Sequence, residues 1–556
     1  MFLRALGIFA VLLWIPAAHA AAQTPRDQVA AGYELLHRGD AGAATRHFEA
    51  LQKASPDDLA VRFGWLMAEN DRIDFDAGRM PAFEKSLDAI IELAGKRYDR
   101  THEDTEALFY LANAHLLRAA FRFDHDRGMW GAARDGANAK SYIDKYVKKY
   151  PDDVDAYFVL GTYNYFADIL PAFFKVVRVF LFIPSGNRVE GLKQIERAAR
   201  STFFGPTARL MLMDIYTEFE GRPEDAIKLG EGLRSQYPAS DAAARSLAEA
   251  YAGPAAEDHA RAAMLFGTIA ARYKSDTSVE GRARHYRALF AQSVQLQESW
   301  RIQDAIALLT SGVESAPADP AWVLPQFLLR RGNLQALLND ANAAEDARRV
   351  LNESKDAGWR KGATDQIAWI DQRRASGEAA RYAALIPANR LVADGQWQEA
   401  RRLYDAIRAR EPQNLNVQYR LAVLDFQSGM PDRGAVAFGA LAANRIASTS
   451  MRAMALLYTA RVHDLSGRRA EAIKVYEQVI DRYEKESAAN LARAGLLAPY
   501  RKRGPQVLRQ LPAHERHELR ELARIDEVTP VAVLEIAALQ LCRDESGFRD
   551  RNERVV

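Results

Sequence analysis

Cysteine is almost absent from this chain of 556 residues, in which Cys542 is the single one. One cysteine excludes an intrachain disulfide and any metal site that needs a pair of thiolates, so the fold must be stabilised by packing. Because Cys542 follows the apolar run 533–541, we expect it to lie buried on a helix. Pairing with another molecule is the alternative.

An excess of charge of either sign is also lacking. The chain has 75 basic and 73 acidic residues, a formal charge of +2, and its arginines are scattered along helical patterns beside Asp and Glu. This distribution is typical of solvated helix faces and not of a phosphate-binding stripe, so we expect no nucleic acid partner. Strand-like alternation is rare as well, which favours an all-α fold.

Catalytic motifs are missing too. We find no glycine-rich phosphate loop and no nucleophile elbow, so we predict no catalytic residue, no cofactor, no metal and no enzymatic activity. One cluster leaves an alternative open, a metal-dependent enzyme built on His514, His517 and Glu518. Its histidines are three residues apart, whereas helical metalloprotease sites need four, so a charged, solvated helix is the expected structure.

The N-terminus carries a segment typical of export. Residues 1–4 are positively charged, residues 6–15 form an apolar run too short to span a bilayer, and Ala18-His19-Ala20 supplies a cleavage site. We predict that residues 1–20 are a removed secretory signal peptide, with residues 20–22 offering an alternative cut. A composition rich in Ala and Arg with few Lys indicates a bacterial source. The expected location is therefore periplasmic or secreted.

A short pattern recurs along the chain. It has a small residue, a glycine seven later, a small residue five after that, a large residue four further on, and a proline eight beyond it. The two most complete copies are Gly32, Gly39, Ala44, Phe48 and Pro56, and Ala388, Gly395, Ala400, Tyr404 and Pro412. Two partial copies are Ala422, Gly429, Gly434 and Phe438, and Ala460, Gly467, Ala472 and Tyr476.

Each position of the pattern has a physical reason. Small residues on consecutive helices let the two helices approach closely, and glycine takes the left-handed conformation that ends the first helix. The large residue lies one turn after the small one and packs against the next unit. Proline then ends the second helix. Because no unit buries its apolar face alone, neighbouring units must stack.

The pattern resembles the tetratricopeptide repeat (TPR), a helix–turn–helix unit of about 34 residues. The resemblance implies an all-α fold, a TPR-like α-solenoid in which antiparallel helix pairs form a right-handed superhelix. It also implies a protein that binds protein or peptide partners. We count about ten units. The second unit has a loop lengthened by the polar segment 124–136.

The pattern predicts four parts after the signal peptide. Residues 27–357 form a TPR-like array that is interrupted by an apolar hairpin at residues 166–184. Residues 358–380 form a degenerate helical spacer, and residues 381–484 form the regular array. Residues 485–556 form an irregular helical cap and tail.

The insertion is the feature that the repeat explains least. It is intensely apolar, is bracketed by prolines and carries a set of aromatic and basic residues: Phe173, Phe174, Lys175, Arg178, Phe180 and Phe182. We expect a hairpin packed against the array. An interfacial helix that lies on a membrane surface through residues 169–183 and an exposed patch for a protein partner are the alternatives. The surrounding string, residues 161–192, resembles a pattern in little-characterised bacterial exported TPR proteins.

In TPR proteins the second, fifth, ninth and twelfth positions of the repeat line a concave ligand groove. Mapped onto residues 381–484, these positions are Tyr382, Leu385, Asn389, Val392, Asn416, Tyr419, Val423, Phe426, Met454, Leu457, Arg461 and Asp464. Aromatic rings, amides and one arginine suit an extended peptide and its carboxylate. The alternative is that these are ordinary surface residues. A consistent Lys/Asn/Arg set for clamping a C-terminal carboxylate is lacking.

The sequence therefore predicts an exported TPR scaffold that mediates protein–protein interactions in the bacterial cell envelope. The expected partner is a protein or peptide. The first alternative is a peripheral membrane-associated protein that attaches to a membrane surface through the hairpin at residues 169–183. The second alternative is the metal-dependent enzyme that uses the His514 cluster.

Overall fold

The computed structural model describes residues 25–125, 127–169, 184–253 and 256–501, and every regular element in these ranges is a helix. The helices of the first part are α1 (Pro25–His37), α2 (Ala41–Ala54), α3 (Leu59–Ile73), η1 (Ala77–Arg79), α4 (Met80–Thr101), α5 (Thr105–Asp124), α6 (Met129–Lys149), α7 (Ala156–Ile169) and α9 (Arg188–Ala198). The signal peptide, residues 170–183, the His514 cluster and Cys542 lie outside the described residues, so the predictions about them stay predictions.

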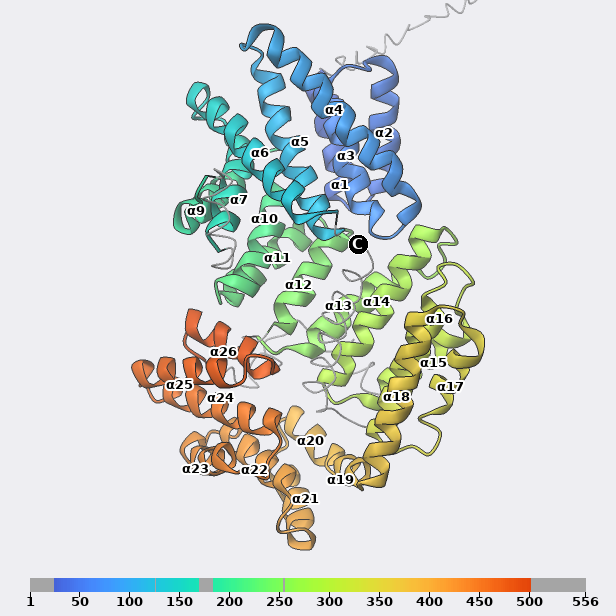
Figure 1. The fold of residues 1–556 in the computed structure, drawn as a ribbon, viewed down its shortest axis with the longest axis vertical. Coiled ribbons are helices and arrows are strands. Elements are labelled where there is room, and N and C mark those ends of the chain that lie inside the picture. Colours follow the sequence, from blue (N-terminus) through green and yellow to red (C-terminus); the bar gives the residue numbers. More distant parts are fainter. Residues whose placement is uncertain (1–24, 126, 170–183, 254–255, 502–556) are drawn as a thin grey trace, which may run out of the picture.

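The middle of the chain continues the series of helices. Its elements are α10 (Gly205–Asp214), the π-helical turn η2 (Ile215–Phe219), α11 (Pro223–Gln236), α12 (Asp241–Ala252), α13 (His259–Tyr273), α14 (Val279–Glu298), α15 (Ile302–Glu314), α16 (Val323–Leu337), α17 (Glu345–Glu353) and α18 (Ala357–Ala375). The last part contains α19 (Glu378–Ala383), α20 (Ile386–Ala393), α21 (Trp397–Arg410), α22 (Leu415–Gln427), α23 (Pro431–Ala443), α24 (Thr449–Leu465), α25 (Arg469–Arg482) and α26 (Ser487–Leu497). Consecutive helices pack against one another, and the described chain is an all-α, TPR-like solenoid (Figure 1).

The turns between paired helices confirm the role of the repeat glycine. The residues with positive φ at these turns are Gly39, Gly221, Glu257, Trp300, Asn339, Gly395, Gly429 and Gly467. Each lies five residues before the small residue of its second helix, as in Gly39 before Ala44 and Asn339 before Ala344. The backbone N–H of the next residue donates a hydrogen bond to a carbonyl in the last turn of the first helix, as from Asp340 to Gln335 at 3.0 Å. The turn geometry is therefore kept even where glycine is absent.

Small residues also allow the close approach that the pattern predicts. The ring of Phe48 is fully buried, and a Cβ at Gly32 or Gly64 would lie 2.7 or 2.8 Å from a ring carbon. In the third unit, a Cβ at Gly161 would lie 2.7 Å from the backbone nitrogen of Ile195. Helices α7 and α9 can therefore pack backbone to backbone only because glycine stands between them.

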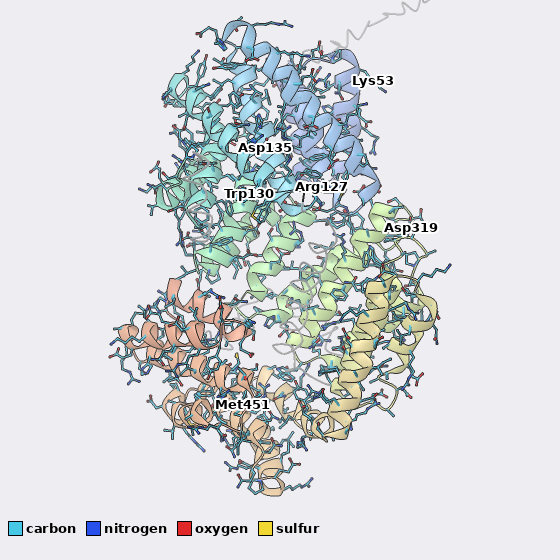
Figure 2. All side chains as sticks on the ribbon, in the orientation of Figure 1. Lys53, Arg127, Trp130, Asp135, Asp319 and Met451 are labelled. Atoms are coloured by element: carbon cyan, nitrogen blue, oxygen red, sulfur yellow. The ribbon has the colours of Figure 1, made fainter. Side chains whose placement is uncertain are left out.

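The lengthened loop predicted at residues 124–136 is wrong. Helix α5 ends at Asp124 and α6 begins at Met129, so most of this polar segment is helical. Figure 2 shows Trp130 near the start of α6 and Asp135 further along it. Asp135 is polar but buried, because cations of α5 surround its carboxylate and supply the partners that a loop would have taken from water.

Units that are far apart in sequence also touch. Arg72 on α3 donates to Glu280 on α14 at 2.8 Å, and Arg284 on the same helix donates to Asp71 at 2.6 Å. The guanidinium of Arg284 also lies 4.1 Å from the ring centroid of Phe75. The first units therefore close onto the fifth, and α1–α14 share one hydrophobic core.

The last units turn back toward the middle of the chain. Arg461 on α24 forms an ion pair of 3.1 Å with Glu257, which lies in the turn before α13. A Cβ at Gly221 would lie 3.3 Å from the Cβ atoms of Leu497 and Ala498. Figure 1 shows this return, with α26 below α11. The solenoid therefore makes a second contact between its C-terminal units and the α10–α13 region.

The two flanks of the insertion lie side by side. The hydroxyl of Tyr163 on α7 donates to the carbonyl of Pro184 at 2.7 Å, and the backbone nitrogen of Asn187 donates to the carbonyl of Asn164 at 2.9 Å. The chain thus returns next to the point where it left α7. Within the described residues, no helix combines the length and the apolar character that crossing a membrane requires.

Candidate functional site

The first predicted groove positions lie inside the protein. Tyr382 on α19 and Asn389 on α20 are buried, and the amide oxygen of Asn389 accepts the hydroxyl proton of Tyr404 at 2.5 Å. Leu385 and Val392 share a hydrophobic core with Tyr404, whereas Tyr382 belongs to the neighbouring core that includes Phe327 and Ile386. This part of the predicted lining therefore packs α20 against α21, and α19 against the helices before it.

The central groove positions form an aromatic cluster. Tyr419 and Phe426 on α22 face Phe438 and Tyr458, with centroid separations of 4.8 Å between Phe438 and Tyr458 and 5.1 Å between Phe426 and Tyr458. Tyr419 lies 6.1 Å from Phe438. Offset and edge-on rings of this kind stabilise the packing beyond the area that they bury. The four rings are buried and belong to one hydrophobic core, which packs α22, α23 and α24 together.

Arg461 is the charged residue beside this aromatic cluster. Its side chain is 5% exposed, and its guanidinium lies 5.3 Å from the ring centroid of Tyr458 and 4.5 Å from that of Tyr500. Burial alone would lower the pKa of Arg461, but the carboxylate of Glu257 and the nearby tyrosines raise it above its usual range. The cation is therefore kept charged in a largely apolar site.

Asp464, one turn after Arg461, is a fully buried acceptor. Its carboxylate receives a hydrogen bond of 2.9 Å from the Tyr476 hydroxyl and pairs with Arg469 at 3.1 Å. It also accepts the backbone N–H of Tyr500 at 2.7 Å. The predicted positions Phe426, Arg461 and Asp464 are thus brought together by one residue of the same chain, Tyr500.

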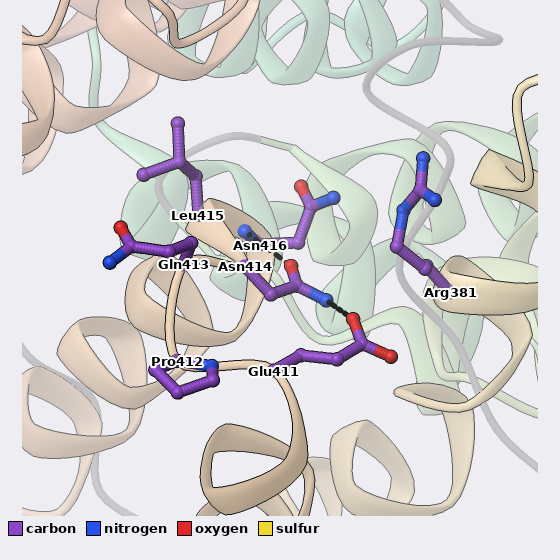
Figure 3. Close-up of a pocket in the computed structure, with 7 residues that line it drawn as sticks. All are labelled: Arg381, Glu411, Pro412, Gln413, Asn414, Leu415 and Asn416. Atoms are coloured by element: carbon purple, nitrogen blue, oxygen red, sulfur yellow. Dashed lines mark hydrogen bonds between the residues drawn. The ribbon is translucent and has the colours of Figure 1, made fainter.

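An open pocket lies at the other end of this array. It has a volume of about 390 Å³ and is lined by Arg381, Glu411, Pro412, Gln413, Asn414, Leu415 and Asn416. Figure 3 shows Arg381 across the pocket from the 411–415 loop. The Asn414 amide donates to Glu411 at 2.8 Å, and its oxygen accepts from the backbone nitrogen of Asn416 at 3.0 Å, which fixes the loop. Asn416 is the predicted groove residue that reaches this pocket.

A second polar cluster lies near the end of α14. Burial and the carboxylate of Glu257 raise the pKa of Glu298 to about 7, while His259 and Arg330 act in the opposite direction. Arg330 on α16 is 4% exposed, and burial lowers its pKa to about 10. Its Nη2 donates to the carbonyl of Ser293 at 3.5 Å, while its Nε has no hydrogen-bond partner among the described residues.

Glu298 gives a pH dependence that can be measured. Because its pKa is about 7 in the folded chain and about 4.3 in the unfolded one, the folded state retains a proton that the unfolded state loses. The free energy of unfolding is therefore expected to fall as the pH rises from about 4.3 to 7, by about 3–4 kcal/mol for this group. Urea unfolding at pH 5 and 8 tests this. Glu298→Gln should be the more stable protein at pH 8 but not at pH 5, and an equal difference at both values would contradict the assignment.

Comparison with protein families bears on residues 391–485. Two tetratricopeptide-repeat models match, one at residues 391–445 and the other at residues 454–485. Residues 391–485 of the chain contain tetratricopeptide repeats. These segments contain the aromatic cluster, Arg461 and Asp464, and TPR units are modules for protein–protein interaction. None of the curated proteins matches this chain.

Two solved structures with TPR-type or related helical folds are similar to this TPR chain. The P58(IPK) TPR domain is 15% identical, with 69% of this chain and 98% of that chain covered and a TM-score of 0.17. The complex of Naa15/Naa10 bound to HypK-THB is 14% identical, with 90% and 84% covered and a TM-score of 0.24. At these scores neither likeness bears on how the units of this chain are arranged.

Reasoning from the TPR pattern missed three residues of the site. Arg381 stands one residue before a lining position, and Tyr500 and Glu257 come from outside the matched repeats. Glu257 could have been found as a turn residue, since it lies five residues before Ala262. Nothing in the sequence signals its contact with Arg461. Within the described residues, no group of three His, Cys, Asp or Glu side chains is placed to hold a metal ion.

Proposed function

We propose that this chain is an exported scaffold of the bacterial cell envelope that binds an extended segment of a partner protein along its last TPR units. The observation that carries the proposal is the open pocket between Arg381 and Asn416. It combines a cation, a carboxylate and amide groups on a loop whose backbone is already fixed. A peptide needs such donors and acceptors, and a rigid receptor loses little conformational entropy when it binds.

Export is supported by the sequence alone. The positive segment, the short apolar run and the Ala18-His19-Ala20 site are together typical of a secretory signal. The composition supports a bacterial source and thus a periplasmic location.

Removing the side chains of two residues that line the pocket is expected to abolish partner binding without unfolding the array. The variant carries Arg381→Ala and Asn416→Ala, and capture of the partner from envelope extract by crosslinking should fall at least about tenfold. Mass spectrometry of the captured chain reads its N-terminus in the same experiment, and Ala21 is the expected first residue.

The matched control carries Arg408→Ala and Asn490→Ala, two exposed side chains of the same array that lie outside the pocket. Capture by the control should equal that of the unchanged chain. Equal capture by the pocket variant would contradict the proposed site, and a mature protein that still carries residues 1–20 would contradict export.

A further inference from the structure

The face of α22 and α24 that carries Phe426, Arg461 and Asp464, called the groove below, is covered by two pieces of the same chain. One is the segment 498–501, which follows α26 and has no helical structure; Ala498 is extended, with φ −142° and ψ 145°. The other is Glu257, which lies more than two hundred residues away in sequence and reaches Arg461 from the turn before α13. Both pieces contact the residues that the TPR pattern assigns to ligand binding.

The contacts of Tyr500 are those of a bound peptide. Its ring lies 5.6 Å from the centroid of Phe426 and under the guanidinium of Arg461 at 4.5 Å. Its backbone N–H is held by the buried carboxylate of Asp464 at 2.7 Å. At the end of α26, the carbonyl of Leu496 accepts a hydrogen bond of 2.9 Å from Arg469, which anchors the helix that the segment follows. One aromatic ring and one main-chain N–H of the segment are thus recognised by side chains of α22 and α24.

Glu257 supplies the anion that completes the set. Its carboxylate is 3.1 Å from the guanidinium of Arg461, yet the side chain is 41% exposed, whereas that of Arg461 is 5% exposed. Its backbone is left-handed, with φ 50°, a conformation that is strained for a residue with a Cβ. An exposed carboxylate on a strained turn is easier to displace than the buried arginine that it neutralises.

We propose that residues 498–501 and Glu257 act as an internal ligand, and that the natural ligand of this groove is an extended peptide with an aromatic residue and a carboxylate. This inference rests on the proposed peptide-binding function and adds a second contact site to it, beside the open pocket. The internal ligand keeps Arg461 and Asp464 paired while the groove has no partner, since a buried charge without a partner is destabilising. A partner peptide replaces the same contacts and releases both pieces.

The tether sets how strongly the internal ligand competes. A segment joined to its own site has an effective concentration in the millimolar range, so it blocks peptides of moderate affinity. Truncating Tyr500 removes the ring contacts and leaves the groove residues intact. Loss of one well-packed aromatic anchor costs about 2 kcal/mol, which corresponds to roughly thirtyfold in the competition.

The experiment uses the full chain with Tyr500→Ala and a fluorescein-labelled peptide of the sequence Leu-Leu-Ala-Pro-Tyr-Arg, residues 496–501. Fluorescence anisotropy should show binding at least about tenfold tighter than to the unchanged chain. A peptide with Ala in place of Tyr should not bind. Tyr150→Ala, which truncates an exposed tyrosine far from the groove, should behave as the unchanged chain does. Equal binding to all three proteins, or none to the Tyr500→Ala chain with its helix content intact, would overturn the proposal.

A second pair of probes tests the carboxylate. In a Glu257→Ala chain, Arg461 is left without its carboxylate, so a peptide with a free C-terminus should bind several-fold more tightly than the same peptide amidated. Equal affinities of the two peptides would show that Arg461 does not bind the carboxylate of the ligand. If Tyr500→Ala does not fold, the unchanged chain still gives a result. An excess of the peptide should speed hydrogen exchange at the Tyr500 amide, and unchanged exchange would overturn the inference.

These outcomes separate the two proposals. The Arg381→Ala, Asn416→Ala variant is not expected to alter binding of the 496–501 peptide, because neither residue contacts Tyr500. If the pocket variant loses its envelope partners but still binds the 496–501 peptide, recognition of those partners lies in the open pocket. If the peptide binds but the unchanged chain captures no envelope partner, the proposed function is contradicted and the internal ligand is not.

Discussion

Replacing Asp135 by alanine is expected to lower the free energy of unfolding by about 3–5 kcal/mol. The side chain is 1% exposed and receives hydrogen bonds from His115 at 2.8 Å, Arg118 at 2.7 Å and Arg122 at 2.6 Å, all on α5. Burial alone would raise the pKa of Asp135, but the bonds from His115 and Arg118 hold it below its usual range. Without the carboxylate, Arg118 and Arg122 lose their counter-charge and the buried His115 loses its hydrogen-bond partner, which weakens the contact between α5 and α6.

Asp88→Ala provides the matched control. Asp88 pairs with the same arginine, Arg118, at the same distance of 2.7 Å, but its side chain is 67% exposed. A solvent-exposed pair is worth at most about 1 kcal/mol, so this variant should unfold almost as the unchanged chain does. Urea unfolding followed by circular dichroism measures both. Equal losses of stability would show that the number of ion pairs, and not their burial, determines the stability of this helix pair.

The helix pairs and their turns could be predicted from the sequence because both depend on neighbouring residues. The five-residue step to the small position places a left-handed residue at Trp300 and Asn339 as well as at the glycines. The same step fails in the second unit, where Ala139 lies inside the long helix α6. There the buried carboxylate of Asp135 stabilises helix in a segment whose polar composition suggested a loop.

Contacts between distant units could not be predicted in the same way. The pairs Arg72–Glu280 and Arg461–Glu257 join helices from opposite parts of the solenoid. Whether such residues meet depends on the small rotation from one unit to the next, summed over several units. No local pattern encodes that sum.

Only part of the candidate site follows from the repeat spacing. Phe426, Arg461 and Asp464 occupy repeat positions on α22 and α24 and all contact Tyr500, because spacing along a helix fixes the direction of its side chains. Their burial arises from Tyr500 and Glu257, which no repeat position specifies. That these positions bind a partner stays a prediction, for which the peptide experiment is the test.

Gly39→Ala is expected to destabilise the protein by about 3 kcal/mol or more, and chiefly at the contact between its first and fourth units. Gly39 has φ +89°, so an alanine there carries about 1–2 kcal/mol of left-handed strain. In addition, its Cβ would lie 3.0 Å from the Cα of Ser240 and closer still to the carbonyl oxygen of Ala239. These are backbone atoms of the turn before α12 and cannot move aside as a side chain can, so α1 and α2 must shift away from α11 and α12.

Gly467→Ala separates the two contributions. This glycine has φ +71°, the same role in its turn, and no atom of the described residues that an added Cβ would meet within 4 Å. Its substitution should cost only the strain of about 1–2 kcal/mol. Hydrogen exchange read helix by helix should then show loss of protection in α1 and α2 for Gly39→Ala, and a change confined to α24 and α25 for Gly467→Ala. Equal effects would contradict the role of the Ala239 contact. Because only a fold that closes onto itself brings Ala239 to Gly39, the difference between the two variants measures how much that closure contributes.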